Sequence, residues 1–462
     1  MPDGRLAIVL HTHMPYVEGF GTWPFGEEWL WEASATVYVP LLELLDQGAP
    51  VTLSLTPVLC DQLEAPGTHL RLLHFLRDLR ATTHALDAEG CRSSGQPALA
   101  AEVERAAHDY ARAADRLERL GEGGLARGLL RHAAWTSSAT HAVLPLVATD
   151  GGVRLQLRAG IEAHRARVEA AGGAPWRGGL WLPECAHAPW LDPLLEEAGV
   201  HAVCVDLTDV HDDLLRPLRS DAGPLLVPID RRTIELVWSP GGYPSRAAYR
   251  DSHRRTLHHH NPWANDGAVY DRDRALEQAR ADAADFVART RERVAGGGLA
   301  VCALDTELLG HHWYEGLDWL AAVLVEAQRQ GLEIAPLDDA LAGVEPAAAP
   351  AGLPPTTWGE PRTLWTWDGP QVADVAFAAR DAELRVVAAG PAAGPRAVRE
   401  LLALQSSDWA FLVTRDIAGP YPRERVSAHL AALDRALAAG AAADPALRNL
   451  APYADPAMLL VP

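Results

Sequence analysis

Two apolar stretches, each ending in an acidic residue and followed by aromatic and histidine side chains, constrain this chain most. Residues 179–187 (GLWLPECAH) end their apolar run at Glu184, and residues 299–316 (LAVCALDTELLGHHWYEG) end theirs at Asp305. Short apolar runs that end in a polar group are typical of buried strands that carry functional side chains to the mouth of an α/β barrel. The sequence therefore predicts an α/β fold with both acids at strand ends.

The surroundings of the two acids indicate a chemistry. Glu184 is flanked by Trp181 and His187, and the loop after Asp305 contains His311. Apolar and hydrogen-bonding neighbours can tune the pKa of a carboxyl group and bind a sugar. Two such carboxylates suit the acid pair that cleaves a glycosidic bond. The structural alternatives, a helix cap or an ion pair, stay open for either acid taken alone.

Two histidines follow the first expected strand, residues 5–10. His11 and His13 are two positions apart, so on a strand end they point to the same side. They can hydrogen-bond a sugar, form a structural turn, or begin a metal site of the amidohydrolase type. That metal site needs further ligands and usually a lysine, and this sequence has no lysine. Three adjacent histidines, residues 258–260, diverge in direction and seldom bind one ion, so we expect no metal and no organic cofactor.

Composition limits the partners and the compartment. The chain has 462 residues and a formal net charge of −20, which argues against nucleic acid and anionic membranes and is neutral toward an uncharged polysaccharide. Its five cysteines are scattered without a C-x-x-C pair, so we expect neither a disulfide framework nor a zinc knuckle. The apolar run at residues 6–10 is too short for a signal peptide or a membrane span, and we expect a cytoplasmic protein.

Periodicity gives a coarse order of elements. A helical insertion is expected at about residues 61–131, and an Ala/Pro-rich linker at residues 346–355 is followed by a largely helical region. The other expected helices cover residues 26–48, 153–171, 190–199, 271–294 and 317–330. The other expected strands cover residues 51–55, 201–206, 233–238 and 332–336.

Five pieces of the chain, in order, resemble glycoside hydrolase family 57, and among its members the 1,4-α-glucan branching enzymes. They are HTHMPY (residues 11–16) with WPFGEE (23–28), ATH (139–141), the two acidic stretches, and QSSDWAF (405–411). The resemblance implies a distorted (β/α)7-type barrel over residues 1–345, including the helical insertion and a loop region at about 207–232. A C-terminal helical domain over residues 356–462 would complete the cleft.

The resemblance also implies roles for individual residues. Glu184 would be the nucleophile and Asp305 the acid/base of a retaining reaction. For Trp29 the helix core is an equal alternative, and for His141 a role as a satisfied core histidine stays open. The residues expected to bind the glucan are His11, His13, Trp29, His141, Trp181, Trp238, Tyr243, His311, Trp358, Trp367, Asp408 and Trp409.

One segment departs from the family. Residues 207–232 contain no Phe, Tyr or Trp, whereas branching enzymes carry here a mobile loop with a tyrosine that closes over the acceptor sugar. The expected activity is branching of an α-1,4-glucan through a glycosyl-glutamate. Alternatives are an α-amylase-type hydrolase or a 4-α-glucanotransferase of the same family, a glucan-binding protein with little activity, and a metal hydrolase. The sequence does not predict the oligomeric state.

Overall fold

The computed structural model describes residues 4–220, 222–444 and 448–460. Within them, the strands form two five-stranded sheets, one in the order β3-β2-β1-β8 with β9 beside β1, the other in the order β10-β6-β7-β5-β4. The strands are β1 (Arg5–Thr12), β2 (Thr52–Leu55), β3 (Ala133–Trp135), β4 (Gly179–Leu180), β5 (Ala202–Val205), β6 (Leu218–Arg219), β7 (Leu225–Pro228), β8 (Leu299–Asp305), β9 (Glu333–Ile334) and β10 (Ala347–Ala348). The predicted strands at residues 5–10, 51–55, 201–206 and 332–336 are confirmed, with shifted ends.

Two contacts join the sheets into a ring. An isolated parallel bridge pairs Thr136, just after β3, with Leu180 of β4. On the other side, the backbone N–H of Asp230, just after β7, donates to the carbonyl of Val301 in β8 at 2.8 Å. The strands β1, β2, β3, β4, β5, β7 and β8 thus follow one another in a mostly parallel arrangement, and the predicted α/β class is confirmed.

The sequence explains why β1 and β8 form the centre of this barrel. Every residue of β1 after Arg5 is buried, and β8 is buried up to Leu304. Strands that are buried on both faces read as continuous apolar runs, because both sides of a parallel sheet are covered by other elements. The first polar side chains after these runs, among them Asp305, therefore stand where the strands leave the core.

Two local predictions were wrong. Residues 233–238 form part of the helix α10 (Arg231–Trp238), in which the buried residues Ile234 and Val237 lie three apart and Glu235 is exposed. Its β-branched and aromatic residues imitate a strand, but packing of one face against β8 selects the helix. The expected loop at residues 207–232 contains β6 and β7, and the apolar run of β7 pairs with β5 in parallel.

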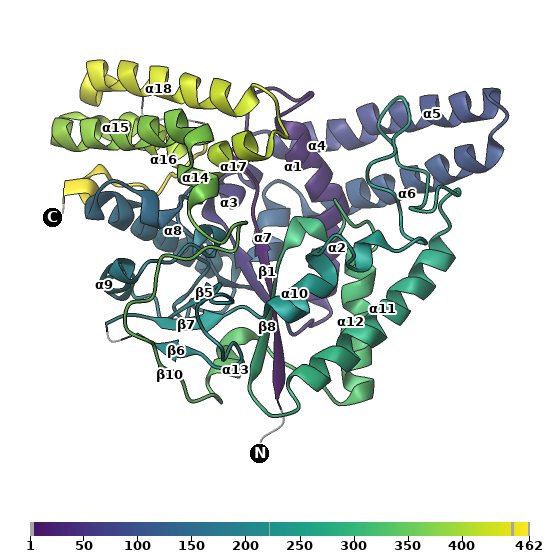
Figure 1. Ribbon diagram of the computed structural model, residues 1–462. Coiled ribbons are helices and arrows are strands. Elements are labelled where there is room, and N and C mark those ends of the chain that lie inside the picture. The colour runs from purple at the N-terminus through teal and green to yellow at the C-terminus, as the bar shows by residue number, and fades with distance from the viewer. Residues whose placement is uncertain (1–3, 221, 445–447, 461–462) are drawn as a thin grey trace.

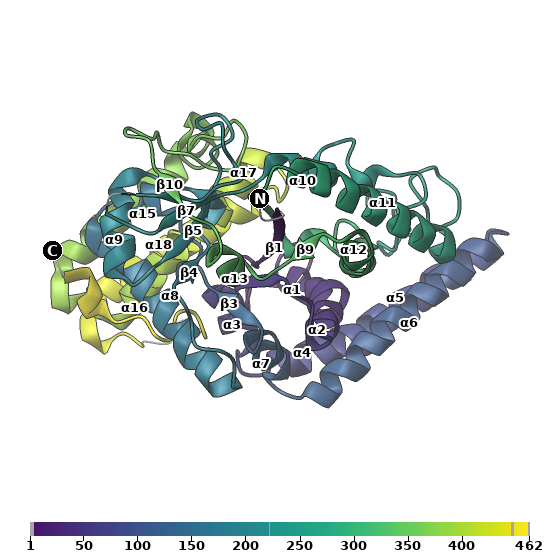
Figure 2. The same ribbon diagram turned by 90° about the horizontal axis from the view of Figure 1, so that it is seen from below.

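Most helices cover the barrel, as Figures 1 and 2 show. The predicted insertion at residues 61–131 is helical, and its helices α5 and α6 lie side by side and extend away from the strands (Figure 1). Up to residue 341 the α-helices are α1 (Glu27–Ala33), α2 (Val39–Asp46), α3 (Pro57–Leu63), α4 (Thr68–His74), α5 (Ala81–Ser93), α6 (Pro97–Leu120), α7 (Gly124–Leu130), α8 (Asp150–Ala171), α9 (Asp192–Glu197), α10, α11 (Arg272–Arg293), α12 (Gly316–Gln330) and α13 (Leu337–Leu341). None of the helices in the described ranges has the length and apolar character that crossing a membrane requires.

The helices after residue 364 pack on one end of the barrel, above α8 in Figure 1. They are α14 (Trp365–Asp368), α15 (Ala373–Ala389), α16 (Gly394–Leu404), α17 (Ser407–Arg415) and α18 (Tyr421–Ala439). Their core includes Val398 and Leu401 of α16 together with Ala139, Val143 and Leu155 from the barrel side. One continuous apolar cluster therefore fixes the C-terminal helices to the barrel.

A polar contact at the start of α8 reinforces this junction. The Thr149 hydroxyl accepts the backbone N–H of Gly152 at 3.0 Å, which caps the helix. The same hydroxyl donates to Glu383 of α15 at 2.5 Å. Glu383 is buried and also accepts the backbone N–H groups of Ala148 and Thr149. One side chain thus caps a barrel helix and binds the C-terminal helices.

Replacing Thr149 with alanine should therefore lower the free energy of unfolding by about 1–2 kcal/mol, the usual loss for a helix N-cap. Urea unfolding followed by circular dichroism measures this value. Thr149→Ser keeps the hydroxyl and should stay within about 0.5 kcal/mol of the parent. Equal losses in both variants would contradict a role for the hydroxyl.

Candidate active site

The backbone at Glu184 is unusual. Glu184 follows β4 in a short turn and adopts φ 61° and ψ 22°, and Cys185 after it has φ 48°. Left-handed conformations are uncommon for residues other than glycine and cluster at functional sites, where the surrounding structure holds them. The side chain of Glu184 keeps 14% of its surface exposed. The chain therefore presents this carboxylate at the strand end instead of sealing it in the core.

Both carboxylate oxygens of Glu184 accept hydrogen bonds from the C-terminal part of the chain. The Trp358 indole N–H donates to Oε2 at 3.1 Å, and the Ser407 hydroxyl donates to Oε1 at 3.0 Å. The backbone N–H of Trp358 also donates to the carbonyl of Glu184 at 3.0 Å, and Arg231 of α10 binds the carbonyl of Trp358. Burial raises the pKa of Glu184, while the two side-chain bonds oppose that rise by favouring the ionised form.

Asp305 is the last residue of β8 and lies beside His11 in the register of β1 and β8. Removal from water raises the pKa of Asp305 well above its usual value, and the carboxylates of Glu184 and Glu307 raise it further, against the opposing effect of His13. Asp305 is therefore the acid whose protonated form the site favours. The two acids predicted from the sequence lie close enough for the charge of one to shift the other.

Glu307 is a third acid at this site, and our sequence analysis missed it. Its Oε1 accepts the Tyr38 hydroxyl at 2.8 Å and the backbone N–H of His13 at 3.2 Å. Burial raises the pKa of Glu307 to about 7. Tyr38 ends a π-helical turn, η1 (Ser34–Tyr38), a feature often found at functional sites. The available signal was the acid two residues after Asp305, whereas nothing in the sequence pointed to Tyr38.

His11, His141 and Ser407 form a hydrogen-bonded series behind Glu184. His11 Nε2 and His141 Nε2 are 2.9 Å apart, and His141 Nδ1 is 2.9 Å from the Ser407 hydroxyl oxygen. The His11 and His141 ring centres are 4.9 Å apart with planes at 21°, so these rings meet edge to edge. Trp181 stacks on His11 with ring centres 4.8 Å apart. The predicted residues His11, His141 and Trp181 are thus brought together.

His13 differs from its neighbours in charge. Its Nε2 is 3.0 Å from Asp408 Oδ1, and its ring stacks on His141 with centres 3.9 Å apart. Burial lowers the pKa of His13, but the carboxylates of Asp408, Glu307 and Glu184 outweigh burial and raise the pKa overall. Burial lowers the pKa values of His11 and His141, which the charge of His13 lowers further. His13 therefore favours the charged form beside two neutral histidines.

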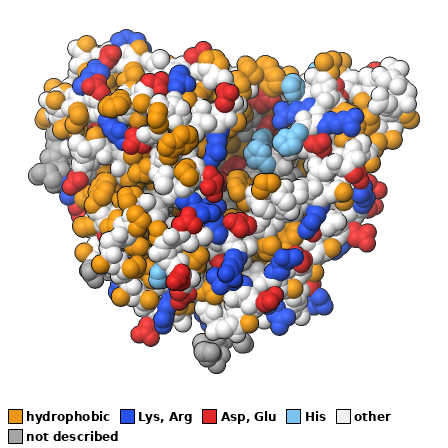
Figure 3. Space-filling view, viewed as in Figure 1, with side chains coloured by type: hydrophobic (Ala, Val, Ile, Leu, Met, Phe, Trp, Pro, Cys, Tyr) orange, Lys and Arg blue, Asp and Glu red, His pale blue; other side chains and the backbone are white. Residues whose placement is uncertain are grey.

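A hollow in the surface leads to this region. Figure 3 shows it between the C-terminal helices and the helical insertion, with acidic side chains inside and histidines at its edge. A carboxylate that accepts two side-chain hydrogen bonds, beside a second carboxyl group whose pKa is raised well above its ordinary value, has the features of a nucleophile and acid pair. The arrangement can cleave a bond at an electrophilic carbon and protonate the leaving oxygen.

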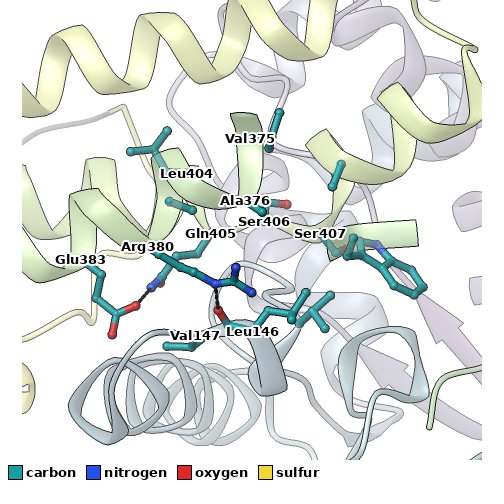
Figure 4. Close-up of a pocket in the computed structure, with 14 residues that line it drawn as sticks. Leu146, Val147, Val375, Ala376, Arg380, Glu383, Leu404, Gln405, Ser406 and Ser407 are labelled. Atoms are coloured by element: carbon teal, nitrogen blue, oxygen red, sulfur yellow. Dashed lines mark hydrogen bonds between the residues drawn. The ribbon is translucent and has the colours of Figure 1, made fainter. Parts of the chain in front are cut away.

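A separate cavity of about 50 Å³ lies on the other side of Ser407 (Figure 4). Arg380 donates to the carbonyl of Leu146 at 3.2 Å, and Gln405 donates to Glu383 at 2.9 Å along its wall. This volume suits a few water molecules and is far below that of a typical ligand pocket. This cavity is therefore too small to hold a glucan chain.

Comparison with known proteins identifies the family. Residues 134–348 match the family described as glycosyl hydrolase family 57, and residues 389–452 match the one described as 1,4-alpha-glucan branching enzyme, C-terminal. A probable 1,4-alpha-glucan branching enzyme of Mycobacterium tuberculosis is 33% identical, over 95% of this chain and 93% of its own. The chain belongs to glycoside hydrolase family 57. The resemblance found in the sequence is thereby confirmed.

Two further family 57 proteins are similar along most of their length. The 1,4-alpha-glucan branching enzyme TK1436 of Thermococcus kodakarensis is 30% identical, over 92% of this chain and 72% of its own. The crystal structure of a branching enzyme of this family from Pyrococcus horikoshii superposes with a TM-score of 0.84 at 28% identity, covering 92% of this chain and 88% of the other. The fold described above is thus the family 57 fold.

Three residues that we predicted to bind substrate are buried in this family 57 chain. Tyr243 is 1% exposed, donates to Asp285 at 2.8 Å and packs near Trp319 under α10. Trp409 is fully buried, and its indole N–H donates to a backbone carbonyl of α16 at 2.7 Å. Trp367 is 3% exposed in the core of the C-terminal helices. Burial leaves these three rings little surface to offer a ligand in this structure, and their contact with substrate stays a prediction.

Three other predicted residues keep part of their surface exposed. Trp29 is half-buried and packs against Phe25 and Tyr421, so the helix-core alternative describes much of its surface. Trp238 is 49% exposed at the end of α10. His311 is exposed, with its ring against His312. Their contact with substrate stays a prediction.

The histidines do not form a metal centre in the part of the chain that the structure describes. No group of three or more His, Cys, Asp or Glu side chains there has the arrangement that holds a metal ion. Among residues 258–260, the imidazole of His258 bonds Asp87 at 2.7 Å, and the ring of His260 stacks on His84. These adjacent imidazoles thus contact different partners.

Because Tyr243 is a core residue, Tyr243→Phe should lower the free energy of unfolding by about 1 kcal/mol through loss of its bond to Asp285. Its Michaelis constant for substrate should match that of the parent. Urea unfolding and steady-state kinetics on the same preparation measure both. A raised Michaelis constant with unchanged stability would return Tyr243 to the substrate site.

Proposed function

We propose that this protein is a retaining enzyme acting on α-1,4-glucan, with Glu184 as nucleophile and Asp305 as acid/base. The observation that carries the proposal is the contrast between the two carboxyl groups. Glu184 accepts hydrogen bonds at both oxygens from Trp358 and Ser407, which oppose the rise of its pKa, whereas burial and the charges of Glu184 and Glu307 raise the pKa of Asp305 well above its ordinary value. Environments that drive two carboxyl groups apart in pKa assign the nucleophile and the acid.

The reaction then proceeds in two steps. Glu184 attacks the anomeric carbon while Asp305 gives its proton to the departing glycosidic oxygen, which leaves a glycosyl ester on Glu184. Asp305, now ionised, takes the proton of the 6-hydroxyl group of an acceptor glucose. That oxygen attacks the anomeric carbon and releases the Glu184 carboxylate. Two inversions give retention, and the product carries an α-1,6 branch.

Branching is the activity that the comparisons favour. The curated relatives with at least 30% identity described above are branching enzymes by name, and the C-terminal match is to a branching-enzyme domain. We propose the division predicted from the sequence, with a catalytic barrel at residues 1–345 and a C-terminal helical domain at 356–462 that completes the cleft. We also propose glycogen-like glucan as the substrate and the cytoplasm as the location, where the five free thiols stay reduced.

Hydrolysis is the second candidate, and one observation favours it. The segment at residues 207–232 lacks aromatic side chains and is partly folded into β6 and β7. It therefore offers no aromatic lid over the glycosyl ester, and transfer to sugar depends on keeping water away from that ester. The balance between acceptor sugar and water decides between the two activities.

Incubation with amylose followed by a debranching enzyme tests the proposal. The wild-type protein should form α-1,6 branch points, detected as new short chains after debranching, with few new reducing ends. New reducing ends without α-1,6 branch points would show that the enzyme hydrolyses the glucan and would contradict branching.

Glu184→Gln tests the nucleophile in the same assay. The substitution should lower the rate by about 10⁴-fold or more, because an amide cannot form the glycosyl ester. Thermal unfolding of the variant close to that of the parent shows that the fold is intact. Substantial turnover by the folded variant would reject Glu184 as nucleophile.

The third acid gives a prediction on pH dependence. A negative charge on Glu307 raises the pKa of Asp305, so Glu307→Gln should lower that pKa. Activity requires protonated Asp305 and therefore falls as pH rises through its pKa. The alkaline limb of kcat/KM should move to lower pH by about 0.5–1 unit. An alkaline limb at the parent position would show that Glu307 does not act on Asp305.

A further inference from the structure

The series of hydrogen bonds behind Glu184 extends one residue further, to Ser54 on β2. The Ser54 hydroxyl oxygen is 3.3 Å from His11 Nδ1. Ser54 is fully buried, and it lies beside His11 in the register of β1 and β2. Four hydrogen bonds therefore connect Ser54, His11, His141 and Ser407 to Glu184.

The positions of the protons in this chain follow from counting donors. Ser407 gives its only proton to Glu184, so His141 Nδ1 must donate to Ser407. Because His141 is neutral, its Nε2 carries no proton and accepts from His11 Nε2. Because His11 is neutral as well, its Nδ1 accepts from the hydroxyl group of Ser54. Each tautomer is thus determined by the bond before it.

A reversed chain is the alternative. The Ser54 hydroxyl can turn to the carbonyl of Thr136, 3.5 Å away, and His11 Nδ1 then donates to Ser54. Every following bond reverses in turn, and the Ser407 proton points to His141. In that state Glu184 loses one of its two side-chain donors. The direction chosen at Ser54 therefore decides how well the carboxylate of Glu184 is held.

We propose that Ser54 is a positioning residue, which by donating to His11 sets the direction of the hydrogen-bond chain that holds Glu184. This inference rests on the proposed role of Glu184 as nucleophile. The bonds point the same way, so each one polarises the next toward the anionic carboxylate. Ser54 touches neither substrate nor reacting atoms and acts through the two histidines and Ser407.

The charged groups around Glu184 are not members of the hydrogen-bond series that runs from Ser54 to Ser407. Asp305, Asp408 and His13 act on its carboxylate through space, and Glu307 acts on Asp305. The hydroxyl of Ser54 does not titrate in the working range. A substitution at Ser54 therefore leaves these charges in place. A shift in the pKa of Glu184 in such a variant measures the effect of the hydrogen-bond series alone.

Ser54→Ala and Ser54→Cys test the proposal through the pH dependence of branching. Loss of a donor raises the pKa of Glu184, so the acid limb of kcat/KM should move to higher pH by about 0.5–1 unit in Ser54→Ala. The value of kcat should fall about 3- to 10-fold with little change in KM. Cysteine has a similar shape and a weak donor, and should give an intermediate shift. If the alanine variant does not fold, the cysteine variant carries the test.

Thr52→Ala is the matched control. Thr52 is a buried hydroxyl residue of the same strand, but its oxygen accepts the backbone N–H of Leu337 at 2.7 Å, outside the chain. It should lose thermal stability to a similar degree and keep the parent acid limb. The acid limb of kcat/KM could lie at the same pH in Thr52→Ala and in both Ser54 variants while Glu184→Gln is inactive. That result would reject the positioning role of Ser54 and leave the proposed function in place. An active Glu184→Gln would overturn the function itself.

Nitrogen-15 NMR of histidine-labelled enzyme gives a second readout, with signals assigned by single His→Gln variants. The wild type should show a proton on Nε2 of His11 and on Nδ1 of His141. The Ser54→Ala variant can neither donate to nor accept from His11 Nδ1, so it should lose this preference and show a mixture of the two tautomer pairs. The reversed pair in the wild type, or charged rings at pH 7, would overturn the proposal.

Discussion

The hydrogen bonds on the two oxygens of Glu184 are the interactions on which the rest of the site depends. A carboxylate on a left-handed turn at a strand end has no helix or sheet to hold it, and here Trp358 and Ser407 hold it instead. Both donors come from the chain after the barrel. The barrel supplies the reactive group and the C-terminal region supplies its orientation, so neither part contains a complete site.

Burial is the main cause of the pKa shifts of the acids and histidines in the site. Removal from water favours the neutral form of every group, which keeps Asp305 protonated and His11 and His141 uncharged. Specific partners oppose this effect. The two donors to Glu184 limit the rise of its pKa, and the carboxylate of Asp408 helps to raise the pKa of His13 against burial.

Much of the fold was predictable from the sequence, and the exceptions have physical causes. Apolar runs located β1 and β8, and helical periodicity located the insertion and the long barrel helices. α10 was misread because β-branched residues fit a strand as well as a helix, and only packing against β8 decides. Both acids were located by their position after apolar runs. The burial of Tyr243, Trp367 and Trp409 was not predictable, because a sequence does not show whether an aromatic ring faces a cleft or a core. Ser54 and Tyr38 were missed because their roles exist only through contacts between distant segments.

The dependence of Glu184 on the C-terminal region has a consequence for how the enzyme comes into being. A ribosome makes the barrel first, and Glu184 lacks its Ser407 donor until residues beyond 400 have emerged and docked. A chain that ends before residue 358 lacks both side-chain donors to this carboxylate. For the same reason, the barrel of this enzyme cannot be transplanted as an independent module; its exchangeable unit is the whole chain.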